Sequence, residues 1–146
     1  KSFSLNDTKK IAANLARKII IKKNKTATVI ALVGDLGTGK TAFVSGFLRG
    51  LGMSNKIKSP TFILMRKYFS RKNNKYIYHI DVYRIKNKKE LNLLRFKEIL
   101  NDPRNILLIE WADKIKQILP KDSIWVYFNY GEKENERRII IKNISL

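Results

Sequence analysis

The fold is decided by the stretch Gly34-Asp35-Leu36-Gly37-Thr38-Gly39-Lys40-Thr41. It fits the pattern G-x-x-x-x-G-K-[ST], in which backbone amides surround phosphate groups at the start of a helix. Residues 28–33, just before it, are apolar and β-branched, as in a buried parallel strand. Residues 43–51, just after it, repeat large apolar side chains every four positions, and glycines at 50 and 52 end that pattern. Strand, glycine loop and helix follow one another in the order that a phosphate-binding loop requires.

Each residue type in this loop suits an anion. Glycines such as Gly34, Gly37 and Gly39 let the backbone approach closely, because they have no Cβ to clash. The amides then point inward, and the start of the helix adds positive potential. Lys40 can reach the β- and γ-phosphates of a nucleotide, and the Thr41 hydroxyl suits Mg²⁺. A glycine-rich turn with a stray lysine does not explain why these two residues begin a helix.

Length and composition are those of a globular protein. The chain has 146 residues, and we expect one domain spanning residues 1–146. The absence of cysteine excludes disulfides and cysteine-based zinc sites. No apolar run approaches the ~20 residues of a membrane span, and the N-terminus has no signal-peptide pattern. We therefore expect a cytoplasmic protein that does not act on membranes.

The charge is strongly basic. Lys and Arg number 31 against 12 Asp and Glu, which gives a net charge of +19. Such a field favours polyanionic partners, most obviously nucleic acid. However, the basic residues are spread along the chain, and Lys, Asn and Ile are abundant throughout, as under base-composition drift in an AT-rich genome. A direct RNA contact and compositional drift both stay open on charge alone.

The rest of the chain alternates helical and strand patterns. A first helix, with an apolar stripe at 11, 15 and 19, is expected to be capped by Asp7 or Thr8. Further helices are expected at 88–100 and 113–119, and strands at 62–69, 76–81, 106–110, 123–130 and 137–144. Two pairs of these strands form hairpins. We predict an α/β fold, a three-layer P-loop NTPase domain with a mixed (parallel plus antiparallel) central sheet.

Two of the apolar runs end in an acidic residue, Asp81 and Glu110. Ligands of open α/β sheets bind outside the carboxyl ends of the strands, so both acids are expected to meet Thr41 across the phosphate pocket. One acid would hold the metal, directly or through water, and the other would orient the attacking water. The alternative is that one of them is a surface charge or the partner of a basic neighbour.

Three neighbours of these acids have two interpretations each. Trp111 lies against the nucleotide or a partner, or packs in the core, as tryptophans more often do. His79, the single histidine, tunes the nearby acid Asp81 or is simply satisfied within its strand. Arg84 neutralises transition-state charge or is one of many surface cations.

Four motifs in order resemble the TsaE family, the small bacterial ATPases of tRNA threonylcarbamoyladenosine biosynthesis. They are the loop at 34–41, the Ser-Pro-Thr-aromatic segment within 58–62, the His-x-Asp-x-Tyr-Arg box at 79–84 and the Glu-Trp pair at 110–111. Three features depart from the family pattern: a longer, lysine-rich segment before the first core strand, Ala112 in place of the usual proline, and a loosely matching C-terminal hairpin. These departures leave the adenine contacts open, but not the phosphate chemistry.

The resemblance implies a role for each site residue. The nucleotide-binding residues would be Gly34, Leu36, Gly37, Thr38, Gly39, Lys40, Thr41, Trp111 and Asp113. Thr41 and Glu110 would bind Mg²⁺, with Asp81 as a further acid in the same pocket. Lys40, Asp81 and Glu110 would form the catalytic set together with Thr61, a switch-like residue near the γ-phosphate.

The resemblance also implies a function and partners. Family members act with the transferase TsaD and its companion TsaB, which place a threonylcarbamoyl group on adenosine 37 of tRNA. The chain would be a Mg²⁺-dependent ATPase, weak alone and stimulated by its partners, and not itself the transferase. Whether it touches tRNA directly stays open.

The residues by themselves leave two other functions open. One is a small-molecule or nucleoside kinase, although the sequence has no arginine-rich insertion that would serve as a lid. The other is a non-enzymatic basic RNA-binding module, which does not explain two acids at strand ends.

Overall fold

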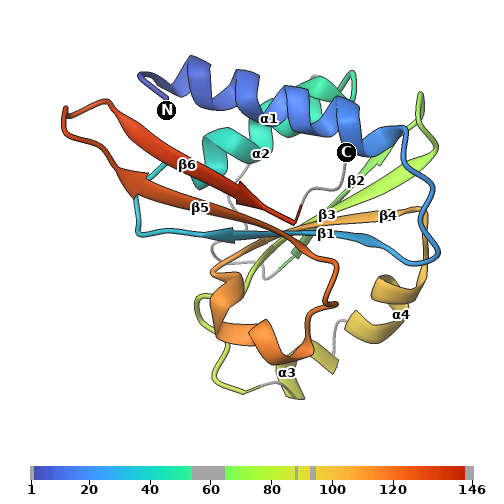
Figure 1. The fold of residues 1–146 in the computed structure, drawn as a ribbon. Helices are drawn as coiled ribbons and strands as arrows, with labels where there is room; N and C mark the ends of the chain where they lie inside the picture. Colours follow the sequence, from blue (N-terminus) through green and yellow to red (C-terminus); the bar gives the residue numbers. More distant parts are fainter. Residues whose placement is uncertain (1, 54–64, 88, 93–94, 144–146) are drawn as a thin grey trace.

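Six strands form one mixed sheet in the computed structural model, which describes residues 2–53, 65–87, 89–92 and 95–143. The strand order is β2-β3-β4-β1-β5-β6 (Figure 1). The strands are β1 Thr28–Val33, β2 Met65–Ser70, β3 Lys75–Asp81, β4 Asn105–Glu110, β5 Ile124–Tyr130 and β6 Arg137–Lys142. The four central strands are parallel, whereas β2 and β6 pair antiparallel at the two edges. The predicted mixed sheet, a parallel unit with antiparallel hairpins, is therefore confirmed.

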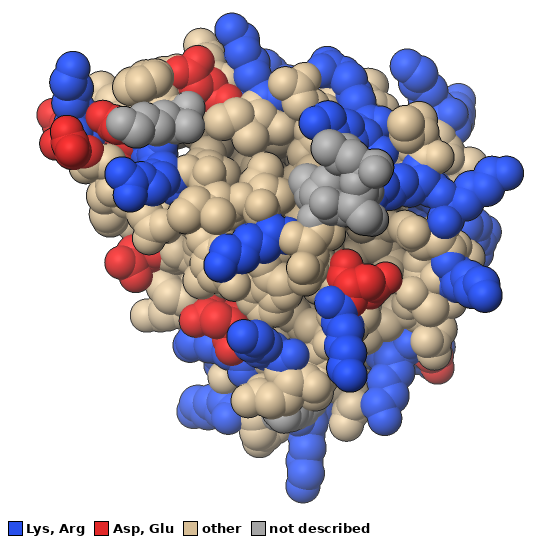
Figure 2. Space-filling model, in the orientation of Figure 1, with Lys and Arg blue, Asp and Glu red and all other residues tan. Residues whose placement is uncertain are grey.

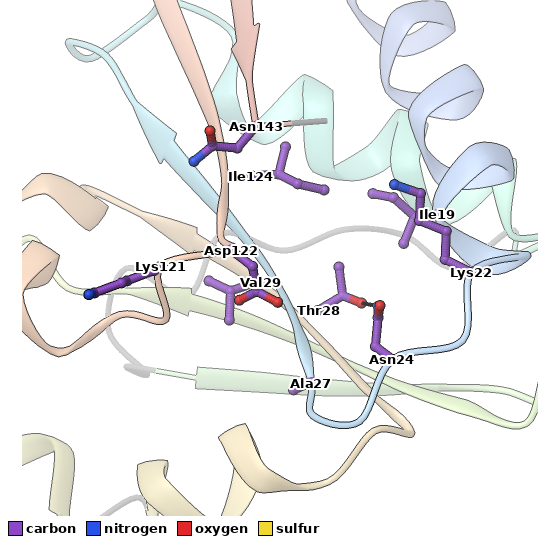
Figure 3. A pocket seen from close by; sticks show the side chains of 10 residues that line it. All are labelled: Ile19, Lys22, Asn24, Ala27, Thr28, Val29, Lys121, Asp122, Ile124 and Asn143. Carbon is purple, nitrogen blue, oxygen red and sulfur yellow. Dashed lines mark hydrogen bonds between the residues drawn. The ribbon is translucent and has the colours of Figure 1, made fainter. Parts of the chain in front are cut away.

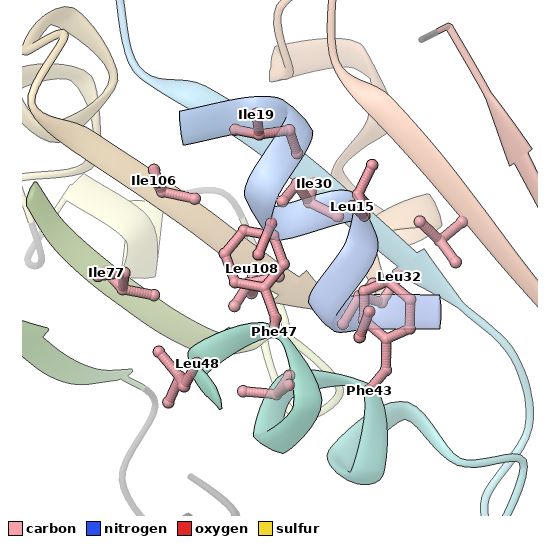
Figure 4. Packing of buried hydrophobic residues seen from close by; sticks show 14 of the residues in the cluster. Leu15, Ile19, Ile30, Leu32, Phe43, Phe47, Leu48, Ile77, Ile106 and Leu108 are labelled. Atoms are coloured by element: carbon pink, nitrogen blue, oxygen red, sulfur yellow. The ribbon is translucent and has the colours of Figure 1, made fainter. Parts of the chain in front are cut away.

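Helices cover both faces of this sheet, which gives the predicted three layers (Figure 1). On one face lie α1 Leu5–Ile20 and α2 Lys40–Gly50, and on the other lie α3 Lys89–Asn92, α4 Phe96–Asn101 and the 3-10 helix η1 Ala112–Ile118. Side chains alternate across a strand. Ile30 and Leu32 of β1 therefore pack with Phe43 and Phe47 of α2 in one core (Figure 4). The intervening residues of β1 join the second core, beneath α3, α4 and η1.

The two helices of the first layer touch backbone to backbone. A Cβ added at Gly46 would lie 2.3 Å from the carbonyl oxygen of Lys9, and one at Gly50 would lie 2.6 Å from that of Ala13. Both distances are shorter than any ordinary Cβ contact, so only glycine allows α1 to approach α2 this closely. The approach fixes the position of α2, and with it the phosphate-binding loop.

The start of the first helix differs from the prediction. Ser4 is the N-cap, and its side chain accepts a hydrogen bond from the Asp7 amide at 3.1 Å. Asp7 instead lies in the first turn, where its negative charge interacts favourably with the positive end of the helix dipole. Thr8 is buried, with its hydroxyl 2.7 Å from that of Ser2. The prediction of a cap at Asp7 or Thr8 was wrong because Ser4, three residues before Asp7, is the N-cap.

The single helix expected at 88–100 is instead two short helices, α3 and α4. Arg95 has a φ of 56°, a left-handed conformation that cannot continue a helix. The helix expected at 113–119 is confirmed as the short η1, with non-helical backbone at Ile115. The start of the strand expected at 62–69 lies outside the described residues. The longest described helix has 16 residues, and none in the described ranges is long and apolar enough to cross a membrane.

Candidate nucleotide-binding site

The glycine loop lies at the carboxyl end of β1, in the middle of the sheet, and leads directly into α2. Gly37 and Gly39 have φ values of 78° and 103°, a left-handed region that other residues rarely adopt. The Thr38 hydroxyl donates to the carbonyl of Asp35 at 2.6 Å, which closes the turn. A Cβ at Gly34 would lie 2.8 Å from the Cβ of Phe128. The loop thus has the glycine-dependent backbone that an anion cradle needs.

The outer part of the loop is held by the C-terminal hairpin. The Tyr130 hydroxyl donates to the carbonyl of Leu36 at 2.5 Å, and the Arg137 guanidinium donates to that of Gly37 at 3.3 Å. The guanidinium also lies 4.8 Å from the centre of the Tyr130 ring. Sequence reasoning missed both residues, because their contacts cross about a hundred positions. The parallel pairing of β5 with β1, which brings them to the loop, is visible only in the sheet.

The two strand-end acids lie side by side. Asp81 and Glu110 are register partners in the parallel pair β3–β4, and Glu110 is also the register partner of Leu32 in β1. With Lys40 and Thr41 they line one cavity of about 500 Å³. The other lining residues are Leu5, Leu36, Gly37, Gly39, Ala42, Tyr83, Arg84 and Trp111. The loop, the acids and the tryptophan, which are up to 75 positions apart in the sequence, therefore surround a single space.

His79 contacts Glu110 rather than Asp81. Its Nε2 lies 2.5 Å from Oε2 of Glu110, and the two residues are 0% and 5% exposed. Among the described residues Nδ1 of His79 has no hydrogen-bond partner. We therefore place the proton of the imidazole on Nε2, where it donates to the carboxylate. A buried donor of this kind fixes which way the carboxylate points.

Lys40 lies against Trp111 inside the cavity. Its Nζ donates to the carbonyl of Gly34 and lies 3.9 Å from the centre of the tryptophan ring. Burial lowers the pKa of Lys40, while the negative charges of Glu110 and Asp81 oppose that shift. The ammonium is thus poorly hydrated and close to two carboxylates, and a bound polyphosphate would provide a further counter-charge.

Asp81 is the more exposed of the two acids. Burial raises its pKa, although its Oδ1 accepts a hydrogen bond from the Tyr83 amide at 2.9 Å, which lowers the pKa again. Glu110 also raises it, because two carboxylates at adjacent strand ends repel each other. A cation between the two acids would relieve this repulsion.

The remaining predicted residues have different placements. Trp111 packs, half-buried, against the second core and also lines the cavity, where its contact with a nucleotide or a partner stays a prediction. Arg84 lines the cavity as well. Asp113 is exposed at the start of η1 and does not line the cavity, although its charge reaches Lys40. Thr61 lies outside the described residues, as does the segment 58–62 of the sequence motif.

The donor set suits a hard cation held jointly with a nucleotide. A threonine hydroxyl and two carboxylates are oxygen ligands of the kind that Mg²⁺ takes, usually from one or two side chains plus substrate phosphates. In the part of the chain that is described, no group of three or more His, Cys, Asp and Glu could hold a metal by itself. Thr41, Asp81 and Glu110 are thus oxygen donors that fit Mg²⁺ bound together with a polyphosphate.

A second cavity, of about 390 Å³, lies at the opposite end of β1 (Figure 3). It is lined by Ile19, Lys22, Asn24, Ala27, Thr28, Val29, Lys121, Asp122, Ile124 and Asn143. Inside it the amide of Asn24 donates to the hydroxyl of Thr28 at 2.8 Å. None of the predicted site residues lines it, whereas several of them line the cavity at the glycine loop.

Comparisons with known proteins found a family model, relatives and a solved structure that are similar to this chain. The family model described as "Threonylcarbamoyl adenosine biosynthesis protein TsaE" matches residues 3–139. A tRNA threonylcarbamoyladenosine biosynthesis protein TsaE of Haemophilus influenzae is 37% identical over 124 residues, which cover 84% of this chain and 77% of the relative. The protein of the same name from Bacillus subtilis is 34% identical over 137 residues, covering 93% and 80%. The crystal structure of Bacillus subtilis YdiB superposes with a TM-score of 0.70 and 28% identity, covering 93% of this chain and 78% of the other.

Proposed function

The chain belongs to the TsaE family of tRNA threonylcarbamoyladenosine biosynthesis proteins, and on this premise we propose that it binds and hydrolyses ATP in support of that pathway. One observation supports this most strongly: Lys40, at the end of the glycine loop, shares a cavity with two adjacent strand-end carboxylates. A loop that only binds phosphate does not need both acids. A hydrolase needs them to hold the metal and to orient water.

Lys40 and the backbone amides of residues 36–41 bind the β- and γ-phosphates in this proposal. On arrival of the nucleotide, Lys40 exchanges its contacts with Trp111 and the carbonyl of Gly34 for phosphate oxygens. Thr41, Asp81 and Glu110 are the residues that would hold Mg²⁺. When bound, the ion neutralises the charge that develops on the phosphates during transfer.

The reaction is the attack of water on the γ-phosphorus, in line with the bond to the β-phosphate oxygen. That bond breaks with its electron pair on the β-phosphate oxygen, and ADP leaves. The oxygen of the water stays on the released phosphate with one of its protons, and the second proton passes to another oxygen of that phosphate. His79 holds the Glu110 carboxylate in one orientation through Nε2. Asp81 is held by the Tyr83 amide and faces the same space. Catalysis in this arrangement is positioning and charge neutralisation, without a covalent intermediate.

Family membership supports a proposal about partners. We propose that the chain acts with a TsaD-type transferase and a TsaB-type companion in the cytoplasm. They stimulate its weak intrinsic turnover, and the transfer of the threonylcarbamoyl group to adenosine 37 of tRNA occurs on the transferase. Exposed apolar residues at the mouth of the cavity, Leu36 at 70% and Tyr83 at 46%, fit a site that a partner covers.

Phosphate release from MgATP, with no other acceptor present, tests the proposal and separates it from a kinase. We expect slow release by the parental chain and none by folded Lys40→Ala or Glu110→Ala. Lys10→Ala, at an exposed position of α1, is the matched control and should keep the parental rate. Release that requires a nucleoside or sugar hydroxyl would favour the kinase instead. A folded Glu110→Ala chain at the parental rate would contradict the assignment of that acid.

A further inference from the structure

One face of the β5–β6 hairpin combines aromatic rings with lysines. Trp125 and Tyr127 lie two positions apart on β5 and are both half-buried. Their register partners on β6 are Lys142 and Ile140, and Ile140 is 40% exposed. With Lys116 of η1 and Lys121 after it, the two rings and Lys142 line a cavity of about 350 Å³. We call Lys116, Lys121, Trp125, Tyr127 and Lys142 the β5–β6 platform.

The rings of the platform are arranged as a surface for flat ligands. The centres of the Trp125 and Tyr127 rings are 6.2 Å apart, and their planes differ by 21°. The ammonium of Lys116 lies 5.8 Å from the Trp125 ring, and that of Lys142 lies 5.4 Å from the Tyr127 ring. Each of the two rings therefore has one lysine ammonium over it, at the range where such pairs attract. Two roughly parallel rings flanked by cations are suited to bases that are joined by phosphates.

Charge by itself does not select this surface. Figure 2 shows Lys and Arg spread over a whole face of the molecule, with Asp and Glu much rarer. The lining of the platform cavity contains three lysines and no acidic residue, and the aromatic rings distinguish it from a merely basic area. The cavity shares no lining residue with the nucleotide site. It is therefore a separate surface that the proposed ATPase does not use.

We propose that the β5–β6 platform binds single-stranded RNA, with bases stacked on Trp125 and Tyr127 and phosphates neutralised by the three lysines. Stacking is tolerant of sequence, because every base has an aromatic face, so we expect little base preference. The choice of RNA over other single strands rests on the proposed function, since the relatives are named for tRNA modification. Binding itself requires neither ATP nor hydrolysis.

The first test measures how salt weakens binding. A fluorescein-labelled oligouridylate of about ten nucleotides is titrated at 50–300 mM KCl without nucleotide. The triple variant Lys116→Gln, Lys121→Gln, Lys142→Gln removes three phosphate contacts. Each contact contributes roughly 0.7 to the slope of log affinity against log salt, so the slope should become about 2 less steep. The control triple changes Lys10, Lys18 and Lys23, exposed on or just after α1, to Gln. It removes equal charge and should keep the parental slope. Equal losses in both triples would overturn the proposal.

The second test measures stacking. Tyr127→Leu should weaken RNA binding at least about fivefold, whereas Tyr127→Phe keeps the ring and should bind as the parent does. Should Tyr127→Leu fail to fold, a Trp111→Phe chain leaves Trp125 as the only tryptophan. Oligouridylate should quench its fluorescence, and inorganic polyphosphate, which has no bases, should not. A fluorescence that RNA leaves unchanged, or that both polyanions quench alike, would overturn the proposal.

These readouts are independent of the ATPase. Hydrolysis is therefore measured on the parental chain. If RNA quenches Trp125 but the parental chain hydrolyses no ATP, the platform stands and the proposed function is contradicted. If the parental chain hydrolyses ATP but RNA leaves the fluorescence of Trp125 unchanged, the proposed function stands and the platform is contradicted.

Discussion

Removing the His79 imidazole should disable the site while the fold survives. In His79→Ala, the Glu110 carboxylate loses a 2.5 Å hydrogen bond in a place where water scarcely reaches it, since Glu110 is 5% exposed. A hydrogen bond to a charged group contributes about 1.5–3 kcal/mol. If that energy orients the carboxylate in the transition state, kcat should fall about 10- to 150-fold.

The assay is the initial rate of phosphate release over a range of ATP and Mg²⁺ concentrations, which separates kcat from KM. Thermal unfolding in parallel reports the folded fraction. His79→Gln retains an amide that can donate to the carboxylate and should recover part of the rate. Ile77→Ala is the matched control, because Ile77 is also fully buried on β3 but packs in the first core. It should lose stability and keep kcat when folded.

Two results would refute this reasoning. One is a folded His79→Ala chain with the parental kcat. The other is an Ile77→Ala chain that loses as much activity as His79→Ala, which would mean that any defect in β3 has the same effect.

Three further predictions concern the acid, the loop and the helix contact. Asp81→Asn should abolish hydrolysis and raise Tm at pH 7, since burial raises the pKa of Asp81 and makes its ionised form unfavourable in the fold. The gain in Tm should disappear as pH falls below the ordinary pKa range of a carboxyl, because the side chain at position 81 is then neutral in both proteins. A gain in Tm that persists there would contradict the prediction. Tyr130→Phe removes the hydrogen bond to the carbonyl of Leu36 and should weaken ADP binding, measured by calorimetry, about threefold. Unchanged ADP binding would show that the hairpin does not hold the loop. Gly46→Ala forces a Cβ to 2.3 Å from the carbonyl oxygen of Lys9 and should cost about 1–3 kcal/mol in urea unfolding, whereas an unchanged midpoint would show that the helices separate freely.

The parts of the fold that the sequence predicted are those with local signals. The order of strand, loop and helix around Gly39 is carried by residues within about 25 positions of one another. Apolar runs located β1 and β4. Asp81 and Glu110 were read directly from the sequence, and the rule that ligands bind at the carboxyl ends of strands predicted that the two acids lie close together. The structure places Asp81 and Glu110 as neighbours there, as that rule requires.

Side-chain pairing and backbone exceptions were not predictable. His79 was connected to Asp81 by proximity in the sequence, whereas it contacts Glu110 across the β3–β4 pair. The hydrogen-bond partner of His79 depends on which face of the sheet its side chain occupies and on which residue of β4 lies beside it. Both depend on the register between β3 and β4, which the sequence does not give. The break in the helix at Arg95 could not be predicted from the apolar periodicity either, because arginine is not a residue type that favours the left-handed conformation.

The central claim is that Lys40, Asp81 and Glu110 act on one magnesium-bound triphosphate. The most direct measurement is the rate of phosphate release from MgATP by the purified chain, alone and with its TsaD-type and TsaB-type partners. We expect slow release alone, a clear increase with the partners, and no release by Glu110→Ala in either case. A folded chain that releases no phosphate even with the partners present, or a Glu110→Ala chain as fast as the parent, would contradict the account.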